Sequence, residues 1–115
     1  MRKEIQIPDI YFKESIFQGA ILSEDNKLKI FIVTVDLKKV VIEFSNLLQM
    51  KFSHGTNVNG IFEKIGISMY VQNALEVIFD NAPILHSFKH YQVEGLDDNP
   101  IIELVADSIK VFVRK

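Results

Sequence analysis

The chain of 115 residues has the size of one domain, and we interpret residues 1–115 as a single domain. It contains no cysteine, which excludes disulfides, zinc–thiolate sites and thiol nucleophiles. Its net charge of −2, without a basic stripe, argues against nucleic-acid binding.

The N-terminus carries positive charge but no apolar segment follows it, so it does not read as a signal peptide. Long charge-free stretches, such as residues 65–75, are too short to span a membrane. We therefore expect a soluble, cytoplasmic protein that does not contact a membrane.

Residues 5–12 are short and apolar but contain Pro8, which cannot donate a hydrogen bond to a strand ladder. This pattern predicts an edge strand or an irregular arm.

Three segments with period-two patterning follow, namely residues 17–22, 27–35 and 39–52. The polar gaps between them, residues 23–26 and 36–38, have the length of hairpin loops. The pattern predicts an antiparallel meander.

The second segment, residues 27–35, is apolar on both faces, which predicts an interior strand with cover on both sides. In residues 39–52 the even positions are apolar except Asn46, so we expect a bend or bulge there, since Asn tolerates left-handed backbone. Ile32 and Phe44 are predicted core residues.

Residues 54–60 are rich in Gly and Asn and read as a loop, whereas residues 61–66 are ambiguous.

Residues 68–79 fit an amphipathic helix that Ser68 caps and residues 80–83 end. Its expected apolar face consists of Val71, Ala74, Leu75, Ile78 and Phe79. A pair of short strands is the rival interpretation, because the segment is rich in residues that favour sheets.

The C-terminal part contains three strand-like segments, residues 86–94, 101–106 and 109–113. Residues 95–100 and 107–108 have turn composition, which predicts a second meander. The fold class is therefore α+β, mainly antiparallel sheet, with an N-terminal meander, C-terminal hairpins and one principal helix that covers a sheet face.

Histidines are the first residues to consider for chemistry. On a strand, His86 and His90 would share a face with Glu94, but the spacing matches no known metal motif. His54 lies in the glycine-rich loop without a positioned nucleophile. We expect no catalytic residue, no metal and no cofactor.

Glu43 and Glu103 each lie within an apolar strand. An outward-facing position on a half-exposed sheet is the favoured interpretation. The alternative is a core-facing carboxylate, which would need a partner and could have a raised pKa.

Two parts of the chain carry a resemblance: residues 40–46 leading to Lys51 and Phe52, and residues 90–93 with 102–106. They resemble a loose group of small, mostly uncharacterised bacterial domains, some of which are immunity proteins of bacterial competition systems. The polar positions that match are Glu43, Asn46, His90 and Glu103. The resemblance implies binding to another protein and brings no catalytic residue.

We expect a domain without enzymatic activity that binds a protein partner. The outer face of residues 39–52 mixes apolar Val41 and Leu47 with charged Glu43 and Lys51, as non-obligate interfaces do. The possible interaction residues are Glu43, Lys51, His54, His90 and Glu103. Two alternatives stay open: a ligand-binding or enzymatic site near the histidines, and a structural subunit that pairs with a second copy of itself through an exposed strand.

Overall fold

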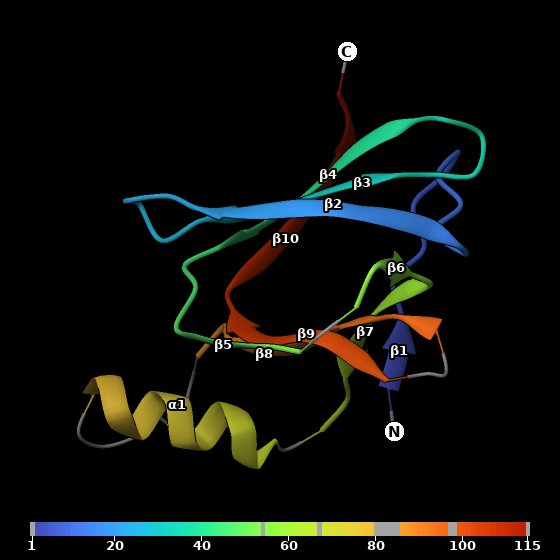
Figure 1. Ribbon diagram of the computed structural model, residues 1–115. Helices are drawn as coiled ribbons and strands as arrows, with labels where there is room; N and C mark the ends of the chain where they lie inside the picture. Colours follow the sequence, from blue (N-terminus) through green and yellow to red (C-terminus); the bar gives the residue numbers. More distant parts are fainter. Residues whose placement is uncertain (1, 54, 67, 80–85, 97–98, 115) are drawn as a thin grey trace.

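The computed structural model describes residues 2–53, 55–66, 68–79, 86–96 and 99–114. Within these residues the chain forms ten strands and one helix, and the strands are arranged in two antiparallel sheets of five. The predicted class, an α+β fold with mainly antiparallel sheet, is confirmed. The two sheets lie one above the other, and the helix lies below the lower sheet (Figure 1).

The upper sheet, which we call sheet I, contains the predicted meander. Its strand order is β10-β4-β3-β2-β6. The strands are β2 (Ser15–Leu22), β3 (Leu28–Val33), β4 (Lys39–Ser45), β6 (Asn57–Val58) and β10 (Ser108–Val113). β3 lies in the middle, so its predicted interior position is confirmed. The loop expected over residues 54–60 includes the short strand β6.

The lower sheet, sheet II, has the order β1-β7-β8-β9-β5. Its strands are β1 (Arg2–Glu4), β5 (Gln49–Phe52), β7 (Gly60–Lys64), β8 (Lys89–Glu94) and β9 (Pro100–Ala106). The ambiguous segment before the helix is therefore a strand. β8 and β9 form the expected hairpin, but His86 lies before β8 and not in it. The N-terminal segment, residues 5–12, is the irregular arm, with an isolated bridge between Ile7 and Ile10.

The main core fills the space between the two sheets. Ile32 and Phe44, the two predicted core residues, are fully buried there. Phe44 of sheet I meets Tyr91 of sheet II with 5.1 Å between the ring centroids. Burial raises the pKa of Tyr91 to about 12, so its hydroxyl stays neutral in this apolar layer.

Two of the places where the chain passes from one sheet to the other are corners at polar residues. β4 passes into β5 at Asn46, whose φ of 55° confirms the bend expected there. β9 passes into β10 at Asp107, and Asn46 Nδ2 donates to Asp107 Oδ2 at 3.0 Å. The predicted hairpin turn at residues 107–108 is therefore wrong, because β10 pairs with β4 and not with β9. A short polar gap suits a sheet-to-sheet corner as well as a hairpin turn.

The helix α1 (Met69–Phe79) confirms the helical interpretation over the rival pair of strands. Val71 N donates to Ser68 Oγ at 3.3 Å, so Ser68 is the predicted cap. Val71, Ala74 and Leu75 pack on Val105 of sheet II. The apolar face is shorter than expected, since Ile78 and Phe79 are exposed. The stop signal predicted at residues 80–83 lies outside the described residues.

One expectation about sheet I is wrong. The apolar residues on both faces of β3 predicted cover on both sides, but only Leu28, Ile30 and Ile32 are buried, whereas Phe31 and Val33 are half-buried. No described element packs on the outer face of sheet I (Figure 1). The apolar residues of that face are therefore available for another role.

Candidate functional site

A polar cluster lies where the start of α1 meets sheet II. His90 Nε2 is 2.6 Å from Glu103 Oε1, and His90 Nδ1 is 2.9 Å from Ser68 Oγ. A carboxylate can only accept, so Nε2 carries the proton and donates to Glu103. Nδ1 of the neutral ring then accepts from the Ser68 hydroxyl. The cluster thus joins a helix cap to two strands of the sheet.

Burial sets the protonation state of this histidine. The His90 side chain is only 5% exposed, and burial lowers the His90 pKa while the hydrogen bond and charge of Glu103 oppose that shift. Tyr70 stacks on the imidazole with 4.7 Å between centroids, and its hydroxyl donates to the Glu103 backbone oxygen at 3.3 Å. Burial also raises the pKa of Tyr70. The neutral form of His90 is therefore favoured in the folded chain.

The order hydroxyl, imidazole, carboxylate is also that of a hydrolytic triad. Here the Ser68 oxygen already accepts the Val71 N–H of the helix cap, and the Tyr70 ring covers one side of His90. Neither Ser68 nor His90 lines the neighbouring groove. These contacts support an architectural role, in which the cluster fastens α1 to sheet II.

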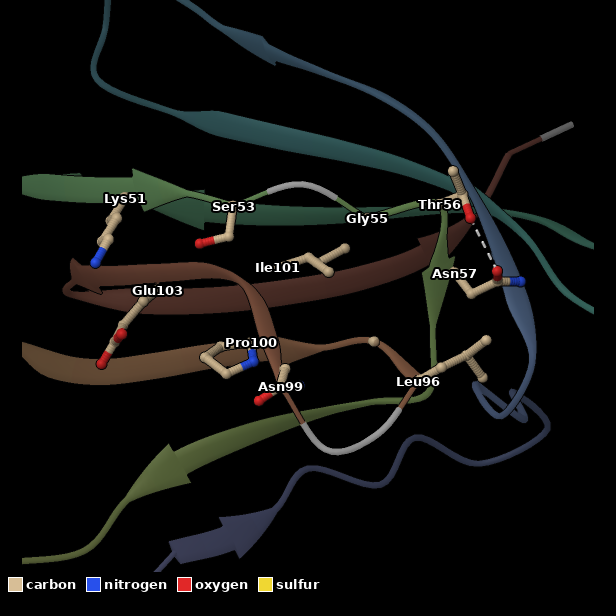
Figure 2. A pocket seen from close by; sticks show the side chains of 11 residues that line it. Lys51, Ser53, Gly55, Thr56, Asn57, Leu96, Asn99, Pro100, Ile101 and Glu103 are labelled. Atoms are coloured by element: carbon tan, nitrogen blue, oxygen red, sulfur yellow. Dashed lines mark hydrogen bonds between the residues drawn. The ribbon is translucent and has the colours of Figure 1, made fainter.

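A groove of about 550 Å³ lies beside this cluster, between residues 51–53 and 55–57 on one side and residues 95–96 and 99–103 on the other. Figure 2 shows Lys51 and Glu103 at one end and Thr56 and Asn57 at the other. The Thr56 hydroxyl donates to Asn57 Oδ1 at 3.0 Å. Glu103 belongs to both features, because it lines the groove and also binds His90.

Two glycines allow Ile101 to form the floor of this groove. A Cβ on Gly55 would collide with the Ile101 side chain. A Cβ on Gly95 would lie 2.9 Å from Ile101 Cγ2 and 3.0 Å from the Asn57 backbone oxygen. Both positions therefore need glycine for close approach.

The structure brings together three of the five residues singled out in the sequence. Lys51, His90 and Glu103 share the outer face of sheet II, with Lys51 directly opposite Glu103 in the register. Glu43 lies on the other sheet, near Lys29 at 4.0 Å. His54 lies outside the described residues. The expected continuous outer face of residues 39–52 is thus wrong, because the corner at Asn46 divides it between two sheets.

Glu103 faces outward from the main core, as the favoured interpretation had it, but α1 and Gln92 crowd it and leave its side chain 25% exposed. Glu43 is also outward and only 14% exposed.

Sequence reasoning recognised Ser68 as a cap but missed its bond to His90, and it did not identify Tyr70 and Gln92 as members of the cluster. The period-two position of Gln92, between His90 and Glu94, was the available signal for Gln92.

The outer face of sheet I is a second candidate surface. Phe31, Val41 and Phe112 lie side by side on β3, β4 and β10. Arg114 lies over the Phe31 ring at 5.6 Å, and Lys110 lies over the Phe112 ring at 5.5 Å. Ile16 and Ile21 of β2 lie further along the same face and are each 56% exposed. We call these seven residues the sheet I face: Ile16, Ile21, Phe31, Val41, Lys110, Phe112 and Arg114.

Among the described residues, no group of three or more metal-ligating side chains is close enough to hold an ion. The described part of the chain also has no helix with the length and apolarity needed to cross a membrane. Comparisons with protein-family models, curated proteins and solved structures found no match to this chain.

Proposed function

We propose that this chain is a non-enzymatic protein-binding domain and that the sheet I face is its contact surface. The observation that carries the proposal is an apolar row on a sheet face that no described helix or strand covers: half-buried Phe31 and Phe112, which is 36% exposed, flank Val41, which is only 3% exposed. Exposed apolar patches of this kind are typical of interaction sites. The resemblance of two segments to small bacterial domains, some of which are immunity proteins, implies the same kind of role.

The charges on this face indicate the chemistry of the partner. The outward positions of β3, β4 and β10 carry Lys29, Lys39 and Lys110, and Arg114 follows β10, whereas Glu43 is the one outward carboxylate on these strands. The chain as a whole has a net charge of −2. Positive charge is therefore concentrated here, and a partner with acidic groups around an apolar centre fits best.

A pair of matched variants tests the proposal. Ile16→Asp with Ile21→Asp changes two residues of the sheet I face, each 56% exposed, whereas Val77→Asp changes a 79% exposed residue on α1. Each variant is used as bait in the native host, and captured proteins are quantified by mass spectrometry. We expect the double variant to lose a partner that the wild type and Val77→Asp retain, with weaker binding at high salt. Equal capture by all three baits contradicts the proposal.

The groove supports a second candidate function, the binding of a small ligand that carries one positive and one negative group. Lys51 and Glu103 offer a cation and a carboxylate at one end of its 550 Å³. Lys51→Glu separates the two functions, because it removes the cation of the groove and leaves the sheet I face unchanged. Loss of small-molecule binding in this variant, measured by NMR titration with amino acids, with unchanged protein capture, assigns the two surfaces to different ligands.

A further inference from the structure

The free edge of β10 is the feature from which a further inference follows. β10 has six residues and pairs only with β4 among the described strands. The other terminal strands are shorter, since β6, β1 and β5 have two, three and four residues. β2 extends beyond β6, but its edge is interrupted by a bulge between Phe17 and Gly19. β10 has neither proline nor a bulge, which are two of the usual protections of an edge strand, and Lys110 is the one charged residue within it.

Two hydrogen bonds show which backbone groups of β10 point outward. Arg114 N donates to Lys39 O at 2.7 Å, in line with the register of β10 and β4. Hydrogen-bonded pairs alternate along antiparallel strands, so the even residues of β10 bond to β4. On the other side of β4, Thr34 N donates to Lys38 O at 3.0 Å. The even residues of β4 therefore bond to β3, and its odd residues bond to β10. The N–H and C=O groups of Ile109, Val111 and Val113 therefore face the free edge.

We propose that β10 pairs antiparallel with β10 of a second copy of this chain, about a two-fold axis at Val111. Val111 then faces Val111 of the second copy, and Ile109 faces its Val113. Three hydrogen-bonded pairs give about six hydrogen bonds across the axis. Sheet I of one copy continues into sheet I of the other. The proposal goes beyond the sheet I face, because it concerns the edge of the sheet and a partner of the same sequence.

Charge selects this register over its two neighbours. An axis at Lys110 places that lysine opposite its own copy, and an axis at Phe112 places Lys110 opposite Arg114 of the second copy. Like charges directly opposite one another destabilise a strand pair. The axis at Val111 instead places Lys110 opposite Phe112 of the second copy. Lys110 already lies over the Phe112 ring of its own chain at 5.5 Å, so a cation–π contact across the axis suits both residues.

Cysteine cross-linking tests the partner and the register together, since the chain has no cysteine of its own. Lys110→Cys and Phe112→Cys are prepared as separate proteins and oxidised alone and as a mixture. In the proposed register these two positions are directly opposite, about 4.5 Å apart between Cα atoms, whereas each lies about 7–8 Å from its own copy. We expect the mixture to form a disulfide much faster than either protein alone. Faster cross-linking within a single variant contradicts the register.

A charge swap provides an independent measurement on the cysteine-free chain. Phe112→Lys places two lysines opposite each other on both sides of the axis, and we expect dimerisation to weaken about tenfold or more. Lys110→Phe combined with Phe112→Lys restores the complementary pairing and should restore the dimer. Light scattering gives the mass, which should be twice 13.2 kDa for the wild type. A wild-type chain that stays monomeric at every concentration overturns the proposal, even if the sheet I face still binds another protein.

Discussion

His90 and Glu103 bond diagonally across β8 and β9. In the register His90 faces Val105 and Glu103 faces Gln92, yet His90 Nε2 lies 2.6 Å from Glu103 Oε1. Gln92, the residue of β8 opposite Glu103, also donates from Nε2 to the same carboxylate oxygen at 3.4 Å. His90, which bonds to Glu103 and also to Ser68 before α1, thereby connects sheet II to the start of the helix.

This contact predicts a pH dependence of stability. Burial lowers the pKa of folded His90 below its ordinary 6.5, against the opposing effect of Glu103. As the pH falls below about 6.5, the unfolded chain therefore takes up a proton before the folded chain does. The stability that neutral His90 contributes is complete above pH 6.5 and is lost as the pH falls toward the lowered pKa. We expect the free energy of unfolding from urea titrations to fall more steeply below pH 6.5 in the wild type than in His90→Gln; parallel curves would show that His90 does not titrate in this way.

Removing the cap should weaken α1. Ser68→Ala removes the acceptor of Val71 N and the hydroxyl that faces His90, so we expect a loss of about 1 kcal/mol in the free energy of unfolding. Ser68→Thr keeps a hydroxyl and serves as the control, with a smaller loss. Chemical denaturation followed by circular dichroism measures both variants. Equal losses would place the stabilisation elsewhere.

Replacing Phe44 should be costly. Phe44 is fully buried between the sheets and packs on Tyr91, so Phe44→Ala should lower the free energy of unfolding by about 3–5 kcal/mol. Phe79→Ala is the matched control, because Phe79 is about half exposed at the end of α1 and should lose far less. A loss below about 1 kcal/mol for Phe44→Ala would contradict the assigned core.

The ion pair between Arg2 and Glu94 should hold β1 in place. The Glu94 side chain is almost completely buried, while Arg2 is about one-third exposed and also lies over the Phe62 ring at 4.1 Å. Arg2→Ala leaves a buried carboxylate without its cation, and we expect a loss of about 1–3 kcal/mol. Lys3→Ala changes an exposed neighbour and should have little effect. Arg2→Ala with Glu94→Gln should recover part of the loss, since the amide carries no charge.

The sequence predicted the strands and the helix well, but it predicted strand pairing and long-range side-chain contacts less well. Period-two patterning identified β2, β3 and β4, and the polar position at Asn46 correctly indicated a bend. The same reasoning misinterpreted Asp107, because local composition does not say whether the next strand pairs with the previous one or leaves for another sheet. The bond between Ser68 and His90 was also beyond reach, since 22 residues separate them and only the packing of α1 on sheet II brings them together.

The corners at Asn46 and Asp107 have a consequence for how the chain folds during synthesis. Sheet I needs β10 from the end of the chain beside β4, and sheet II needs β1 from the beginning beside β7. Neither sheet is complete within a continuous stretch of sequence, and pairing between distant strands is slow to nucleate. A nascent chain can form the β2–β3–β4 meander early, but β4 keeps an unpaired edge until Ser108–Val113 has left the ribosome. We therefore expect one late, cooperative folding step for the whole domain rather than two sheets that fold in turn.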